Sequence, residues 1–99
     1  MNLIEKNIVP LKKLCNQYNV AKLYVFGSVN THQFNENSDI DFLVRFDPIE
    51  LERYVDNYFD FKFSLENIFN RKIDLLEENA IKNPYLKESI DQTKKLVYG

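Results

Sequence analysis

The 99-residue chain is expected to form a single small domain over residues 1–99, and a domain of this size is compatible with a homo- or hetero-oligomer. Its net charge of −2, from 13 basic and 15 acidic residues, argues against a protein that grips long nucleic acid, because such binding needs a basic face. The chain has no stretch long and apolar enough for a membrane span, and Cys15 is its only cysteine, so a cytoplasmic protein without an intramolecular disulfide is expected.

Helical spacing of apolar residues predicts a first helix near the N-terminus. It is expected to start near Val9, with Pro10 in its first turn, and to end at residues 17–19. The short apolar run 23–26 is rich in β-forming residues and is stopped by Gly27, so it predicts a buried strand.

The middle of the chain predicts a loop region, a strand and a long helix. Residues 29–38 are polar and could hold a short helix followed by a loop, and residues 40–46 predict a second strand. Residues 50–70 form the longest helical pattern, with apolar residues on two stripes, so this helix is more apolar around its circumference than a surface helix requires. The stripes are Tyr54, Tyr58, Phe61, Leu65 and Ile68, and Leu51, Val55 and Phe59.

The C-terminal part predicts a third strand at 72–76 and a last helix. Asn83 is expected to cap this helix and Pro84 to occupy its first position. Its expected buried stripe is Leu86, Ile90, Thr93 and Val97. The alternation of helices and strands predicts an α/β (α+β) fold, in which helices cover a small sheet, but it does not give the strand order or direction.

Asp39 and Asp41 are the first candidate functional residues. They lie two apart at the start of the second predicted strand, so both carboxylates point to one face, with Cα atoms roughly 6.6–6.8 Å apart. Aspartate is disfavoured in strands, and two on one face repel each other unless a cation compensates. A divalent metal such as Mg²⁺, which prefers hard oxygen ligands, is favoured over a pair of solvated aspartates.

Gly27 and Ser28 follow the first predicted strand. Glycine allows a sharp turn and the close approach of a phosphate, while Ser28 could cap a helix or bond a phosphate oxygen. Taken alone, the pair is an ordinary turn and helix cap; with two aspartates downstream, phosphate binding is favoured.

Asp74 alternates with apolar residues in the third predicted strand, so its carboxylate lies on the opposite face from them. If this strand neighbours the second, Asp74 can join Asp39 and Asp41. The alternatives are a surface aspartate on an edge strand, or Glu77 or Glu78 as the third acidic partner.

These residues resemble the signature of the nucleotidyltransferase superfamily that includes DNA polymerase beta. The pattern is Gly-Ser, ten residues, Asp-x-Asp and a third Asp on a later strand, and here residues 29–38 supply the ten. The surrounding sequence is similar to the minimal nucleotidyltransferases of bacteria and archaea over nearly the whole chain. The resemblance implies the polymerase beta-like nucleotidyltransferase fold.

The resemblance also implies a reaction that uses ATP as nucleotide donor and two Mg²⁺ ions. Gly27 and Ser28 would bind the triphosphate, and Asp39, Asp41 and Asp74 would be catalytic metal ligands. A hydroxyl would attack the α-phosphorus and pyrophosphate would leave, with Asp74 helping to deprotonate the hydroxyl.

Minimal nucleotidyltransferases of this kind are often paired with a HEPN-domain protein, as antitoxin and toxin, and some transfer AMP to the toxin. The resemblance therefore implies AMP transfer to a HEPN partner. The chain departs from many relatives in having no arginine soon after Ser28, so a phosphate-facing cation would come from elsewhere in the chain or from the partner. The candidates are Lys22, Arg45, Arg71 and Lys72.

This departure favours an alternative, an antitoxin that neutralises its partner by contact with weak or no catalysis, whereas the three carboxylates favour the enzyme. A third reading, transfer to a small molecule, is disfavoured because 99 residues leave no room for an added acceptor domain.

Overall fold

The computed structural model describes residues 2–27 and 38–99, and it begins with two helices. These are α1 (Asn2–Lys6) and α2 (Ile8–Gln17). The helix predicted to start near Val9 begins one residue earlier. Pro10 lies in its first turn, where the missing N–H of proline removes no helical hydrogen bond.

Four strands form one mixed sheet in the order β3-β2-β1-β4. They are β1 (Val20–Phe26), β2 (Ile40–Phe46), β3 (Ile73–Glu77) and β4 (Lys95–Tyr98). β1 runs antiparallel to β2 and β4, whereas β2 and β3 are parallel. The predicted second strand has the observed bounds, the third is displaced by one residue, and the first begins three residues earlier than predicted. The predicted class, a small mixed sheet covered by helices, is confirmed.

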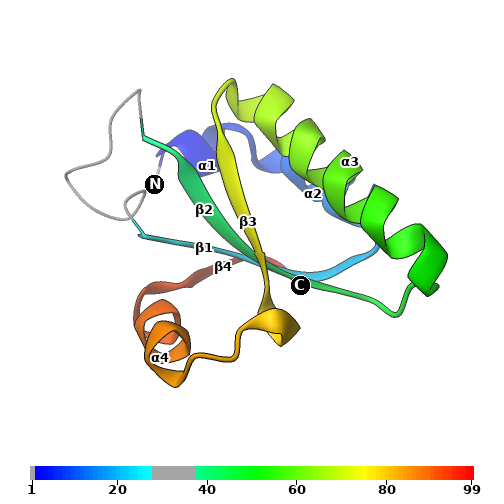
Figure 1. Cartoon of the computed structure of the whole chain (residues 1–99). Helices are drawn as coiled ribbons and strands as arrows, with labels where there is room; N and C mark the ends of the chain where they lie inside the picture. The colour runs from blue at the N-terminus through cyan, green and yellow to red at the C-terminus, as the bar shows by residue number, and fades with distance from the viewer. Residues whose placement is uncertain (1, 28–37) are drawn as a thin grey trace.

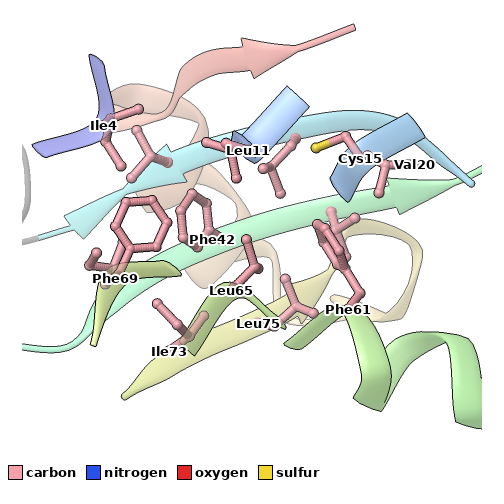
Figure 2. Packing of buried hydrophobic residues seen from close by; sticks show 14 residues of the cluster. Ile4, Leu11, Cys15, Val20, Phe42, Phe61, Leu65, Phe69, Ile73 and Leu75 are labelled. Atoms are coloured by element: carbon pink, nitrogen blue, oxygen red, sulfur yellow. The ribbon is translucent and has the colours of Figure 1, made fainter. Parts of the chain in front are cut away.

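The main core lies between one face of the sheet and the helices α2 and α3 (Leu51–Phe69), which Figure 1 shows on the same side. The first of the two predicted stripes of α3 faces this core and supplies Phe61 and Leu65, which Figure 2 shows against residues from the strands. Cys15 of α2 is also fully buried there, and burial raises the pKa of its thiol to about 12. Neither α3 nor any other helix among the described residues is long and apolar enough to cross a membrane.

The opposite face of the sheet is partly covered by the short helix η2 (Glu78–Ala80) and by α4 (Pro84–Thr93) (Figure 1). Asn83 caps α4 as predicted, because its side-chain oxygen accepts from the N–H groups of Tyr85 and Leu86 at 2.9 and 3.2 Å. Leu43 and Ile90 are buried although they lie outside the main core cluster.

The last helix was predicted to reach Val97, and this prediction is wrong. α4 ends at Thr93, Lys94 is extended with ψ 144°, and β4 begins at the next residue. Val97 still packs against the core, but from a strand that pairs with β1. Pairing satisfies the backbone groups of an otherwise open edge of β1, and this outweighs the helical spacing of the apolar residues. Leu86, the first residue of the predicted stripe, is 45% exposed.

The outer edge of β3 is closed in part by side chains of α3. The N–H of Ile73 donates to the carboxylate of Glu66 at 3.3 Å, and the hydroxyl of Tyr58 donates to the carbonyl of Leu75. These bonds satisfy backbone groups that have no strand beside them. They also tie the strand that carries Asp74 to the longest helix of the fold.

Candidate active site

Asp41 lies on the face of the sheet opposite α2 and α3. Its neighbours Ile40 and Phe42 are fully buried in the main core, and alternation along the strand turns Asp41 away from that core. Asp39 lies one residue before β2 begins, so it is held by the chain that enters the strand. Burial of the apolar residues between and beside them therefore fixes where the two carboxylates emerge.

Asp74 is the residue of β3 that pairs in register with Asp41. Neighbouring strands lie about 4.7–4.9 Å apart, and residues in register on parallel strands present their side chains to the same face. The structure thus brings Asp74 beside Asp41, as expected if the third strand neighbours the second. Asp74 is exposed and Asp41 partly buried, so the pair opens toward solvent on the side of Asp74.

Gly27 follows β1 immediately, with a left-handed φ of +78° that side chains disfavour. A Cβ atom at this position would lie 2.3 Å from Oδ2 of Asp41. Glycine is therefore required at this position for two reasons: the left-handed turn, and the space that the Asp41 carboxylate occupies. Ser28, the other predicted nucleotide-binding residue, and the polar stretch 29–37 lie outside the described residues.

The environment of Asp41 disfavours its charged form. The pKa of Asp41 is raised to about 6. Desolvation by burial is the largest cause, followed by repulsion from Asp74, a hydrogen bond with Asp74 and repulsion from Asp39. None of these causes comes from a cationic side chain. Among the described residues, Asp39 and Asp74 thus both oppose the negative charge of Asp41.

The other acidic candidates, Glu77 and Glu78, have partners elsewhere. Glu77 accepts from the N–H of Asn79 at 3.2 Å, and Glu78 forms ion pairs with Arg45 at 3.7 Å and Lys94 at 3.8 Å. Sequence reasoning missed this ion-pair cluster, because no local motif links the three residues. Asp74, whose register places it beside Asp41, remains the better third carboxylate.

The four basic residues proposed as phosphate contacts differ in their partners and in their positions relative to the aspartates. Arg45 is paired with Glu78, and Lys22 lies opposite Arg45 in the β1–β2 register. Arg71 donates from Nη1 to the carbonyl of Ser38 at 3.0 Å, directly before Asp39. The side chain of Lys72 is exposed. Arg71 is therefore the candidate with a recorded contact next to one of the three aspartates.

The carboxylates fit a Mg²⁺ ion whose remaining ligands would come from substrate and water. In residues 2–27 and 38–99, no three carboxylate, thiol or imidazole groups form a ready-made metal cage. Asp41 and Asp74 nevertheless touch, and Asp39 is close enough to repel Asp41. Mg²⁺ is usually held by one or two carboxylates together with phosphate oxygens and water, so this donor set fits the ion.

Replacing Gly27 by alanine should disturb the carboxylates more than the fold. The left-handed φ should cost about 1–2 kcal/mol of stability, and the new methyl group should push the carboxylate of Asp41 away from Asp74. We expect Mn²⁺ affinity to fall roughly tenfold or more, measured by calorimetry. Asn19→Ala is the matched control, since Asn19 also has a left-handed φ, of 61°, but precedes the other end of β1. Equal Mn²⁺ affinity in wild type and Gly27→Ala would contradict this account.

The raised pKa of Asp41 predicts a pH-dependent cost in metal-free buffer. Because the folded-state value of about 6 exceeds the reference value of 3.8, the contribution of Asp41 to stability is largest below pH 3.8 and is lost as the pH rises through 6. Urea unfolding with EDTA should show Asp41→Asn gaining stability relative to wild type between these pH values, and a constant difference above them. The exposed Asp47→Asn is the control, and a pH-independent difference for Asp41→Asn would rule the explanation out.

Comparison with known proteins places these features in a family. The family model described as polymerase beta, nucleotidyltransferase matches residues 10–99. A Methanocaldococcus jannaschii relative, provisionally named protein adenylyltransferase MJ0128, is 38% identical over 81 residues, which are 82% of this chain and 80% of the relative.

Solved structures share the same fold. A provisionally named minimal nucleotidyltransferase superposes with a TM-score of 0.75 at 27% identity, covering 96% of this chain and 95% of the other. A chain from the complex of a tri-AMPylated Shewanella oneidensis HEPN toxin with its MNT antitoxin gives a TM-score of 0.66 at 18% identity, covering 96% of this chain and 71% of that one. Together with the match over residues 10–99, these likenesses show that the chain belongs to the polymerase beta nucleotidyltransferase family and is a nucleotidyltransferase.

Proposed function

We propose that the chain transfers AMP from ATP to a hydroxyl group of a HEPN-domain partner protein, in a reaction that requires divalent metal, and that it acts as the antitoxin of that partner. The main support for the metal requirement is the contact of Asp41 with Asp74, beside Asp39, on the sheet face opposite α2 and α3. No cationic side chain is among the causes of the raised pKa of Asp41. Such a site favours the binding of cations over the binding of a bare anion.

The choice of AMP and of a protein acceptor is supported by the relatives. MJ0128 is provisionally named a protein adenylyltransferase, and the Shewanella oneidensis complex contains an AMPylated HEPN toxin with an MNT antitoxin. The chain covers 80% of the first relative and aligns over nearly its own full length with the second structure. A protein substrate is therefore a better match than a small molecule.

In the proposed reaction, an oxygen of the acceptor forms a bond with the α-phosphorus of ATP, and the bond from that phosphorus to the pyrophosphate group breaks. Asp74, which is exposed, accepts the hydroxyl proton, while Asp39 and Asp41 hold the triphosphate side of the site. Two Mg²⁺ ions bound by these carboxylates would supply charge stabilisation at the entering and leaving oxygens. Gly27 leaves room for Asp41, and Gly27 and Ser28 would face the phosphates.

The test uses the purified protein, α-labelled ATP, Mg²⁺ and the cognate HEPN protein or lysate of the native host. We expect a labelled protein band that disappears with EDTA and falls roughly 100-fold or more in the Asp39→Asn/Asp41→Asn variant. Asp47→Asn, an exposed aspartate just after β2, should label like wild type. Absence of aspartate-dependent label, with ATP bound and the acceptor present, would overturn the catalytic proposal.

A second candidate function is neutralisation of the partner by contact alone. It is favoured by the sequence after Ser28, Val29-Asn30-Thr31-His32, which lacks the arginines of many relatives. It is also compatible with an exposed apolar stripe on α3, where Leu51, Val55, Phe59 and Phe63 are 44–83% exposed.

The two functions differ in what they require of Asp41. If neutralisation depends on AMP transfer, Asp41→Asn should leave the HEPN toxin active in a growth assay, although the variant still folds and binds it. Full neutralisation by Asp41→Asn would instead support contact as the mechanism. Co-purification of the variant with the toxin is the control for binding.

A further inference from the structure

Arg71 links the end of α3 to the start of β2. Asn70 adopts a left-handed φ of 52° after α3 and turns the chain toward β3. The next residue, Arg71, sends its partly buried guanidinium across to the carbonyl of Ser38, which accepts from Nη1 at 3.0 Å. This contact joins positions 33 residues apart in the chain.

Asp39 lies between two bonds that anchor its neighbours to the same segment. On one side Arg71 holds the carbonyl of Ser38, and on the other the N–H of Ile40 donates to the carbonyl of Lys72 at 3.3 Å. Ile40 is also the first residue of β2 in register with β3. Asp39 itself precedes the ladder, so the Arg71 bond extends the anchoring of this strand one residue beyond Asp39.

We propose that Arg71 is a positioning residue, which holds the backbone at Ser38 so that the carboxylate of Asp39 stays beside Asp41 and Asp74 and can share their metal ion. This inference rests on the proposed metal-dependent function. It assigns Arg71 a task other than direct contact with the triphosphate. The contact with a backbone carbonyl supports it, because this bond ties the chain directly before Asp39 to the segment that follows α3.

Positioning and simple electrostatics predict opposite changes in metal affinity when Arg71 is neutralised. Removing the positive charge of Arg71, which contacts the residue before Asp39, would strengthen the binding of a divalent cation through charge alone. Loss of a residue that orients a ligand instead weakens metal binding, commonly by 10- to 100-fold. Tighter binding would therefore indicate an effect of charge, and weaker binding would indicate loss of positioning. If Arg71 only contacted phosphate, its loss would not weaken the binding of metal without nucleotide.

The experiment measures binding of Mn²⁺ alone to the full chain by electron paramagnetic resonance, without nucleotide, together with thermal unfolding in EDTA. We expect Arg71→Met to bind Mn²⁺ roughly 10-fold or more weakly than wild type while it remains folded. Arg71→Lys keeps the charge and can still donate a hydrogen bond, so it should recover part of the affinity. Arg53→Met removes an equal charge from an exposed position on α3 and should bind like wild type.

Unchanged or tighter Mn²⁺ binding by folded Arg71→Met would overturn the positioning role. If Arg71→Met does not fold, Arg71→Lys decides the question, since its shorter side chain should weaken binding in the same direction and wild-type affinity would count against the proposal. Asp41→Asn tests the proposed function separately. Normal Mn²⁺ binding by Asp41→Asn would rule out the proposed metal site itself. Weak binding by Asp41→Asn together with normal binding by Arg71→Met would rule out only the role of Arg71.

Discussion

The parallel pairing of β2 with β3 is the constraint on which the site depends. It places Asp41 and Asp74 in register on adjacent strands, where their carboxylates touch. A fold gains nothing in stability from such a pair, because like charges at this distance oppose each other. The arrangement fits the proposed function, in which a divalent cation and the phosphates of ATP bind at this pair.

The apolar side of the same strands supplies the rigidity that this arrangement requires. Ile40 and Phe42 flank Asp41, and Ile73 and Leu75 flank Asp74, and all four are buried in the main core. Figure 2 shows Phe42, Ile73 and Leu75 among the side chains of this core. Slipping either strand by one residue would bury a carboxylate and expose two of these side chains. Hydrophobic burial on one face thus offsets electrostatic repulsion on the other, and this is how so small a sheet can hold the site.

Much of this could be predicted from sequence, and the parts that could not share a cause. The strand at 40–46 and the helix start at Asn83-Pro84 depend on neighbouring residues, so local patterns were sufficient to predict them. Two other features depend on which strands pair. They are the position of Asp74 beside Asp41 and the pairing of residues 95–98 with β1, where a helix was predicted. The space that Gly27 leaves for Asp41 and the reach of Arg71 to Ser38 likewise arise between distant segments, which periodicity does not report.

The way α3 closes the outer edge of β3 bears on how a partner can approach. With Glu66 bonded to the N–H of Ile73 and Tyr58 to the carbonyl of Leu75, an incoming strand could extend the sheet beside Asp74 only by displacing both side chains. Recognition through strand addition is therefore disfavoured at this edge. In the proposed reaction, an acceptor that presents its hydroxyl from a loop or a helix would instead reach the exposed Asp74 without disturbing the sheet.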